Sequence, residues 1–201
     1  MNDPTRRKFL SLSAAGMALA TSARVWAAPR EDGVPKLLLD RARAALNREG
    51  GQVTHRDRIG IVDFSKPSRD ARFHIVDLED GSYATYLVAH GRGSDPTHSG
   101  WVERFSNAPG SYATSEGAYL TGGTYEGKHG HSMRLAGLDP QNSNAESRAI
   151  VVHAAYYVGP EIVRDHGMLG RSQGCFAMAA NDLPAVLDRL GAGRLIFAGK
   201  A

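Results

Sequence analysis

The chain has 201 residues, of which 42% are hydrophobic and 22% charged, and its formal net charge is +3. This length allows one domain with a sizeable core, and the single cysteine excludes an internal disulfide. Four basic residues and one acidic residue within residues 1–27 account for the whole net charge, so the rest of the chain is near neutral. We therefore expect no nucleic-acid partner, because such binding requires a basic surface.

Residues 1–27 have the order of features that an export signal requires. The segment TRRKFL at residues 5–10 is a twin-arginine start, a modestly apolar stretch follows, and VWA at residues 25–27 supplies small residues for cleavage. The apolar stretch is too short and too rich in Ser and Gly to span a membrane permanently. We therefore expect the twin-arginine export machinery as a partner, no permanent membrane span and a periplasmic location.

The next predicted element is a helix in a leader at residues 28–58. Residues 36–49 place apolar side chains on or near one helical face, and Gly50 and Gly51 end the helix. A second helix is predicted to start at Asp182 and to end at Gly191.

Strands dominate the rest of the chain. Short runs rich in β-branched and aromatic residues are bounded by turn residues. The expected strands are residues 59–64, 72–78, 83–89, 119–121, 133–135, 148–158 and 194–197. Residues 148–158 give the strongest strand pattern. Two glycine-rich segments, residues 90–115 and 122–130, predict loops, of which the first is expected to be exposed over one edge. The fold class is therefore mainly β with a helix near each end of the mature chain.

The single cysteine, Cys175, ends the run GRSQGC at residues 170–175, downstream of the strand-like AIVVH at residues 149–153. A lone Cys with a His elsewhere in the chain is typical of a thiolate nucleophile and its base. Because an ordinary thiol is mostly protonated at neutral pH, an imidazole such as that of His153 is needed to raise the thiolate fraction. The pattern predicts acyl transfer, and the alternative is a cysteine that only packs in the core.

The residues around the cysteine suggest how its loop would assist the reaction. The N–H groups of Gly174 and Cys175 could donate to a developing oxyanion, at about 3 kcal/mol per donor. Ser172 could hold the loop or the substrate by a hydrogen bond, and Arg171 could pair with a substrate carboxylate.

These motifs resemble the YkuD-type L,D-transpeptidase family. Residues 172–175 match its S-x-G-C signature, with His153 upstream on a strand. The runs VAHGRGS at residues 88–94, FSN at 105–107 and GKHGHS at 127–132 resemble its murein L,D-transpeptidase catalytic domain subfamily. The resemblance covers roughly residues 59–197. It implies a β-sandwich or barrel-like catalytic domain over residues 59–201 that needs no metal or cofactor.

The resemblance also implies a reaction on peptidoglycan stem peptides. Family members attack the bond between the diamino acid at the third position and the D-alanine at the fourth. They release D-alanine and pass the acyl group from a cysteine thioester to the amine of a neighbouring stem. By motif, Cys175 corresponds to the nucleophile and His153 to the base.

The chain departs from the common family pattern at three positions. Gln173 stands where many members have His, Ala154 follows His153 in place of Gly, and Ala177 occupies a position that is often Arg or Asn. Since the Arg or Asn is associated with substrate binding, water remains open as an alternative acceptor. The same site would then be an L,D-carboxypeptidase or a crosslink-cleaving amidase.

Other interpretations of the motifs also remain open. Residues 170–174 satisfy the G-x-S-x-G pattern of serine hydrolases, but no strand directly precedes Ser172 and no helix directly follows it. His166 is a lesser alternative to His153 as the base. A wall-binding module without catalysis would also be compatible with the sequence, because loop geometry decides whether a thiol reacts.

A metal site is the remaining alternative. His129 and His131 would lie on one face of a strand, and with His153 or Cys175 they could form the zinc site of a wall metallopeptidase. No acidic ligand shares the motif, and we expect no metal. His129, His131 and Ser132 are instead candidates for substrate contact.

Overall fold

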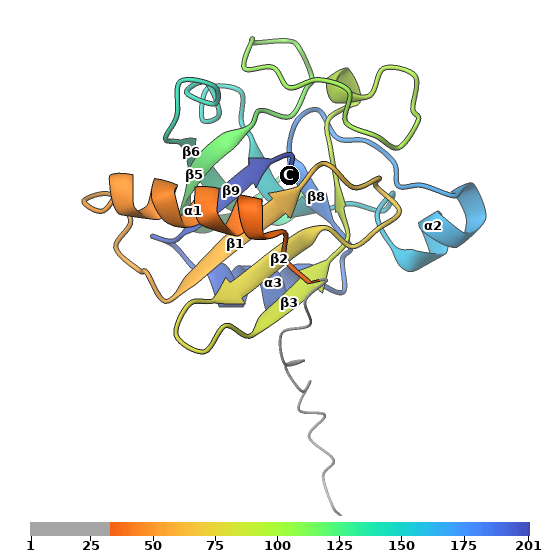
Figure 1. Cartoon of the computed structure of the whole chain (residues 1–201). Coiled ribbons are helices and arrows are strands. Elements are labelled where there is room, and N and C mark those ends of the chain that lie inside the picture. The colour runs from red at the N-terminus through yellow and green to blue at the C-terminus, as the bar shows by residue number, and fades with distance from the viewer. Residues whose placement is uncertain (1–32) are drawn as a thin grey trace, which may run out of the picture.

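The computed structural model describes residues 33–201, so the expected export signal at residues 1–27 lies outside the described residues. The strands are β1 Arg58–Asp63, β2 Phe73–Asp77, β3 Tyr83–Tyr86, β4 Val88–Ala89, β5 Gly117–Gly127, β6 Gly130–Gly137, β7 Val151–Ala154, β8 Phe176–Met178 and β9 Leu195–Gly199. They form one sheet in the order β3-β2-β1-β9-β5-β6-β7-β8-β4 (Figure 1). The structure is therefore mainly β, which confirms the expected fold class.

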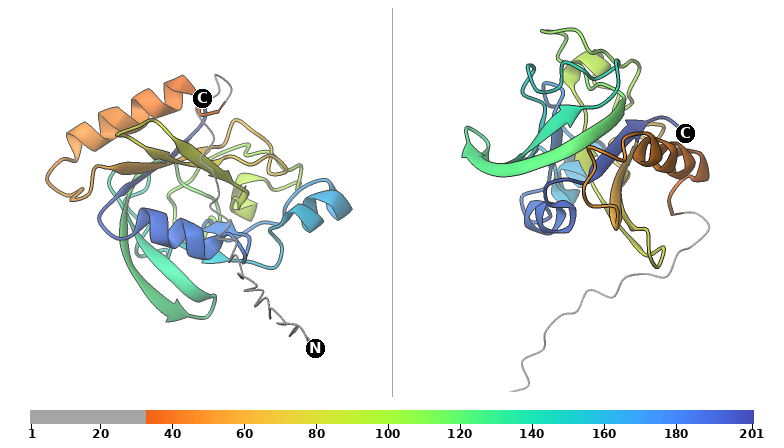
Figure 2. Two further views of the ribbon diagram at one scale, coloured as in Figure 1. Left: turned by 90° about the horizontal axis from the view of Figure 1, so that it is seen from below. Right: turned by 90° about the vertical axis from the view of Figure 1, so that its left-hand side faces the viewer.

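Two helices cover opposite faces of the sheet (Figure 2). Helix α1, Lys36–Arg48, packs on β1 and β9, and α3, Leu183–Leu190, packs on β1 and β2. A third helix, α2 at Pro160–His166, lies at the rim of the molecule and buries no side chain (Figure 1). None of the helices within residues 33–201 has the length and apolar character needed to cross a membrane.

The alternation of β1 divides the core between the two helices. Ile59 and Ile61 pack under α1 together with Leu38. Val62, the residue after Ile61, belongs instead to the cluster that includes Val186 of α3. Successive side chains of a strand point to opposite faces, so a strand that is buried on both faces is apolar at nearly every position.

The strongest expected strand, residues 148–158, is shorter in the structure. Only β7 is extended, because Ala149 has a φ of 52°. This left-handed conformation interrupts a strand, and a residue with a Cβ adopts it rarely. Beyond β7 the chain turns into α2, which the sequence pattern did not predict, and β8 was missed because it has only three residues.

The second glycine-rich segment, residues 122–130, is part of a long hairpin and not a loop between strands. Strands β5 and β6 pair as far as Gly127 and Gly130. The register shifts between Thr121 and Thr124, where Gly122 and Gly123 lie. Glycine is common at such bulges, so its presence marked an irregularity within a strand and not the end of one.

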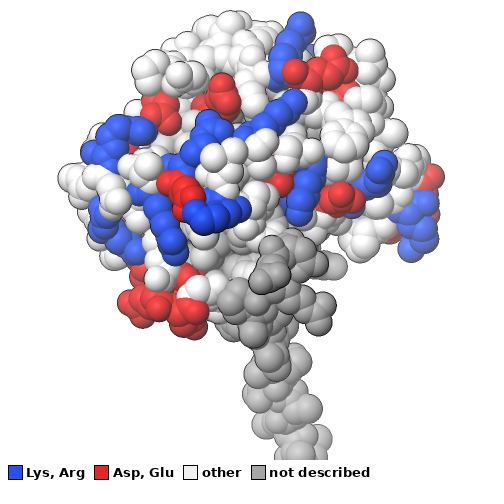
Figure 3. All heavy atoms as spheres, in the orientation of Figure 1, with Lys and Arg blue, Asp and Glu red and all other residues white. Residues whose placement is uncertain are grey.

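The charged side chains of the surface are mixed. Figure 3 shows Lys and Arg interspersed with Asp and Glu on the face that α1 crosses. Several of these charges form ion pairs, such as Lys36 with Asp40 and Arg48 with Asp139. This face thus offers paired charges of both signs, as the near-neutral composition predicts.

Candidate active site

One cavity of about 440 Å³ brings together most of the residues that the sequence singled out. Cys175, His153, Ser172, Arg171 and His129 all line it. Its wall also includes Lys128, Arg148 and Tyr157, to which no sequence pattern assigned a role.

The parallel pairing of β7 with β8 brings Cys175 and His153 to the same cavity. Val152 pairs with Phe176 and His153 with Ala177, so Cys175, directly before β8, lies beside the start of β7. The Cys175 thiol donates a hydrogen bond to the carbonyl of Ala149 at 3.5 Å. Within residues 33–201 no hydrogen bond joins Cys175 to His153, so the thiol is directed to the backbone in this structure.

Burial dominates the ionisation of the thiol. Cys175 is 9% exposed, and this desolvation raises the pKa of its thiol. The Val151 N–H and the charges of Lys128 and Arg148 act in the opposite direction without outweighing burial. The thiol is therefore protonated at neutral pH, and a base must remove its proton before it can attack.

His153 has the protonation state that such a base requires. Its Nδ1 lies 2.8 Å from the carbonyl oxygen of Ala154. Because a carbonyl only accepts, Nδ1 carries the proton and Nε2 of the neutral ring is free of one. Burial lowers the pKa of His153, and the neighbouring His129 and Lys128 lower it further, against the opposing effect of the Ala154 bond. The imidazole is thus neutral at pH 7.

The Cys175 loop is held from within by Ser172. The Ser172 hydroxyl donates to the carbonyl of Cys175 at 2.7 Å and accepts from the N–H of Gly174 at 3.1 Å. The Gly174 amide is thus paired within the loop in this structure, and its expected role as an oxyanion donor stays a prediction. No side chain within residues 33–201 accepts a hydrogen bond from the Cys175 amide, so this amide is the stronger candidate of the two. The Ser172 hydroxyl is also committed to the loop, which does not favour Ser172 as a nucleophile.

Gly174 is required by the backbone itself. Its φ is +117°, and a Cβ at this position would lie 2.7 Å from the carbonyl oxygen of Ala113 and 2.8 Å from Cδ1 of Ile150. No other residue fits both the conformation and the space.

Two arginines at the cavity bind backbone carbonyls. Arg171 Nη1 donates to the carbonyls of Asp95 and Pro96. Nη1 therefore links the Arg171 segment to residues 95 and 96, and the expected pairing of Arg171 with a substrate carboxylate stays a prediction. Arg148 Nη1 donates to the Ser106 carbonyl at 2.9 Å and to Ser115 Oγ at 2.8 Å. No motif marks Arg148, because its partners lie more than thirty residues away in the sequence.

The β5–β6 hairpin brings only one of its candidate residues to the cysteine. The His129 ring stacks on the His153 ring, with centroids 4.3 Å apart and planes at 23°. His131 pairs instead with Glu126 at 2.8 Å, and it lines a second cavity of about 590 Å³ between the hairpin and α3. Ser132 is fully buried and donates to the Gly130 carbonyl, so the structure does not present its hydroxyl on the surface, and substrate contact at Ser132 stays a prediction.

The residues of the alternative sites are not assembled. His129 lies in the hairpin turn and not on a strand face with His131. Within the described part of the chain, no three His, Cys, Asp or Glu side chains are grouped so that they could hold a metal ion. His166 is exposed at the end of α2 and does not line the cavity of Cys175.

A family model described as the L,D-transpeptidase catalytic domain matches residues 32–198. The chain belongs to this family. No curated protein sequence matches the chain.

Solved structures similar to this family member share little sequence with it. An L,D-transpeptidase from Mycobacterium smegmatis has 13% identity and a TM-score of 0.44, with 71% of this chain and 58% of that chain covered. L,D-transpeptidase 3 from Mycobacterium tuberculosis, in complex with a faropenem-derived adduct, has 13% identity and a TM-score of 0.46, with 72% and 60% covered. The helical cell shape determining protein of Campylobacter jejuni has 12% identity and a TM-score of 0.46, with 71% and 47% covered. The match thus spans less than two thirds of each of these chains.

The three departures from the L,D-transpeptidase pattern have different structural consequences. Ala154 still presents the carbonyl that accepts from His153. Gln173 lines the cavity. Ala177 is fully buried in β8, so this position contributes no cation, and the positive charges near the thiol belong to Lys128 and Arg148.

Proposed function

We propose that the protein is a cysteine L,D-transpeptidase that acts on peptidoglycan stem peptides in the periplasm. The observation that carries the proposal is that a buried thiol and a neutral imidazole line the same cavity. Cys175 is the nucleophile, and His153 is the base because its Nδ1–H is held by the Ala154 carbonyl. Membership of the L,D-transpeptidase family supports the reaction class.

The first half-reaction forms a thioester. Nε2 of His153 takes the thiol proton while Sγ of Cys175 attacks the carbonyl carbon between the third and fourth residues of the stem. The Cys175 N–H is the proposed donor to the oxyanion that develops. As the tetrahedral intermediate collapses, the imidazolium gives its proton to the leaving nitrogen, and D-alanine departs.

The second half-reaction regenerates the enzyme. The amine of a neighbouring stem attacks the thioester carbonyl, His153 takes the proton that the amine loses, and the thiol leaves with that proton. Lys128 and Arg148 favour the thiolate in both halves, because their charges lower the pKa of Cys175. Water in place of the amine would give an L,D-carboxypeptidase or, on a crosslink, an amidase.

The twin-arginine machinery is the proposed export partner, and the reaction as written uses no metal or cofactor. The thiol chemistry would also make the protein a target of carbapenem-type β-lactams, whose strained carbonyl resembles the scissile amide.

The proposal is tested by incubation of the purified protein with a disaccharide tetrapeptide, with analysis of the products. We expect D-alanine release and, with a second stem as acceptor, a crosslinked dimer; a free tripeptide would indicate hydrolysis by the same site. Cys175→Ala should abolish all products, and a carbapenem should label the wild-type protein once but not this variant.

Two controls separate the alternatives. Ser172→Ala should retain measurable turnover, since its hydroxyl only shapes the loop. Full activity in Cys175→Ala that is lost in a chelator would replace the proposal with a metallopeptidase, and absence of turnover in the wild-type protein would favour a wall-binding module.

A further inference from the structure

Three buried polar side chains, those of Arg72, His90 and Asp95, form a hydrogen-bonded chain behind the Cys175 loop. Arg72 precedes β2, His90 follows β4, and Asp95 follows the short helix η1 at Arg92–Ser94. All three residues are 0% exposed, and none lines the cavity that holds Cys175. Polar groups that are buried so completely are costly unless each is paired. Segment 90–115 is therefore not the wholly exposed loop that its composition suggested.

The hydrogen bonds of this chain fix the tautomer of His90. Arg72 Nη2 lies 2.7 Å from His90 Nδ1, and His90 Nε2 lies 3.2 Å from Asp95 Oδ2. A guanidinium can only donate, so Nδ1 accepts, and the ring proton is on Nε2, where it is donated to Asp95. Burial and the charge of Arg72 lower the pKa of His90 to about 4. The ring is therefore neutral at the pH of the periplasm.

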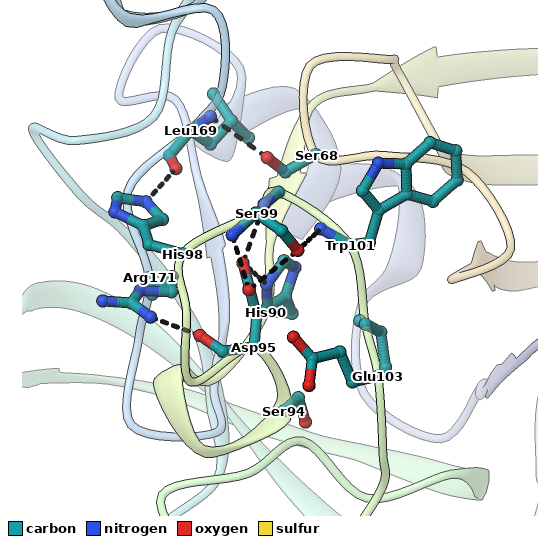
Figure 4. A network of polar contacts seen from close by, with 12 residues as sticks. Ser68, His90, Ser94, Asp95, His98, Ser99, Trp101, Glu103, Leu169 and Arg171 are labelled. Atoms are coloured by element: carbon teal, nitrogen blue, oxygen red, sulfur yellow. Dashed lines mark hydrogen bonds and ion pairs between the residues drawn. The ribbon is translucent and has the colours of Figure 1, made fainter.

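Asp95 is anchored on its other side by its own loop. Its carboxylate accepts hydrogen bonds from the N–H of Ser99 at 2.7 Å and from the N–H of Gly100 at 2.9 Å. Figure 4 shows these bonds, with His90 on one side of Asp95 and Arg171 reaching the Asp95 carbonyl on the other. This series of hydrogen bonds thus connects Arg72, directly before β2, through His90 to the loop of Asp95, which Arg171 also contacts.

The backbone of His90 connects this chain to the cysteine loop. The His90 carbonyl accepts from the Ser172 N–H at 2.9 Å, and the Ser172 carbonyl accepts from the Arg92 N–H at 2.9 Å. Gly91 pairs with Ser172 between these two bonds. Ser172 in turn binds the carbonyl of Cys175. A shift of His90 would therefore move the segment that carries the thiol.

We propose that His90, held as its neutral Nε2–H tautomer between Arg72 and Asp95, is a positioning residue that sets the place of the Cys175 loop. The proposal rests on the proposed function only in taking Cys175 as the reacting group. His90 touches neither the cavity nor the thiol, so it acts through Ser172.

The test compares His90→Ala and His90→Gln with a matched control, His74→Ala. His74 is also a buried histidine, 1% exposed, with a hydrogen bond between its Nδ1 and Oγ1 of Thr85 and a pKa that burial lowers to about 4. It lies on β2 and does not line the cavity. If both histidines were only structural, both alanine variants should lower thermal stability and neither should change the reactivity of Cys175.

Two readouts are measured below the melting temperature of every variant. In His90→Ala we expect kcat for the tetrapeptide to fall roughly 10- to 100-fold. We also expect the pH midpoint of Cys175 alkylation by iodoacetamide to fall towards the ordinary thiol value, because the loop leaves its buried position. His90→Gln should show smaller changes in kcat and in the midpoint, since its amide can still donate towards Asp95. His74→Ala should show neither change.

The proposal is overturned if folded His90→Ala keeps the wild-type midpoint, if His74→Ala shifts it equally, or if wild-type Cys175 does not alkylate. Alkylation needs no peptide, so failure of the wild-type protein to turn over tetrapeptide would count against the proposed function alone. Nitrogen-15 NMR of the wild-type protein tests the tautomer without a variant. We expect a proton on Nε2 of His90 from pH 5.5 to 8, and either a Nδ1–H tautomer or titration near 6.5 would contradict the proposal.

Discussion

Two walls of the cavity are held in different ways. The Cys175 loop is fixed by buried hydrogen bonds through Ser172 and by close packing around Gly174. The opposite wall, at the tip of the β5–β6 hairpin, is exposed and rests on the stacking of His129 on His153. The comparison shows that the Cys175 loop is held by buried hydrogen bonds and close packing, whereas the hairpin tip is exposed and contacts the site through a ring stack.

The largest expected effect on stability comes from replacing a glycine by alanine, and its size should differ between the two walls. Gly174→Ala should destabilise the protein by roughly 3 kcal/mol or more, because the added Cβ meets the Ala113 carbonyl in a conformation that alanine rarely adopts. Gly130→Ala should cost only about 1 kcal/mol, since Gly130 has a φ of +72° with nothing within 4 Å of the added Cβ. Chemical denaturation measures both values, and equal costs would contradict the contrast between the walls.

An intermediate effect is expected from the two cations near the thiol. Arg148→Met should destabilise the protein by about 2 kcal/mol, because it removes the guanidinium that donates to Ser115 Oγ and to the Ser106 and Ala113 carbonyls. Lys128→Met removes the same charge from an exposed position of the hairpin and should have little effect on stability.

Both substitutions should raise the pKa of Cys175, because each removes a positive charge that favours the thiolate. The pH dependence of alkylation measures this shift. A midpoint that stays at the wild-type value in both variants would show that neither charge acts on the thiol.

The smallest effect is expected from His129→Ala. His129 and Lys128 lower the pKa of His153, so removal of the stacked ring should raise that pKa. His153 is then protonated up to a higher pH, and the acidic limb of the kcat/KM profile should move to higher pH with a change of less than about tenfold at its plateau. The matched control is His131→Ala. The His131 ring pairs with Glu126, so its removal should leave the profile unchanged. A shift to lower pH in His129→Ala would reverse the assigned electrostatics.

The sequence predicted the parts of the site that are local in the chain. Cys175 and Ser172 lie within one motif, and His153 lies on a recognisable strand, so their shared cavity needed only the pairing of β7 with β8. The hydrogen bond of the Gly174 amide to Ser172 could not be predicted, because it depends on the exact turn of the loop. Residue types alone do not define that turn.

Residues brought from distant segments were missed for a different reason. Arg148 reaches Ser106 and Ser115 across a long stretch of sequence, and nothing near it marks a site. His90 and Asp95 lie in a glycine-rich segment whose composition is typical of exposed loops. Composition does not distinguish polar residues that face water from polar residues that are buried against one another.

The most direct test of the account is the rate at which Cys175 is acylated by a tetrapeptide stem, measured by intact-protein mass spectrometry with D-alanine determined in parallel. We expect one acyl group per chain on Cys175, one equivalent of D-alanine in the first turnover, and a rate that falls about 100-fold or more in His153→Ala. Acylation at the wild-type rate in His153→Ala, or D-alanine release without any adduct on Cys175, would contradict it.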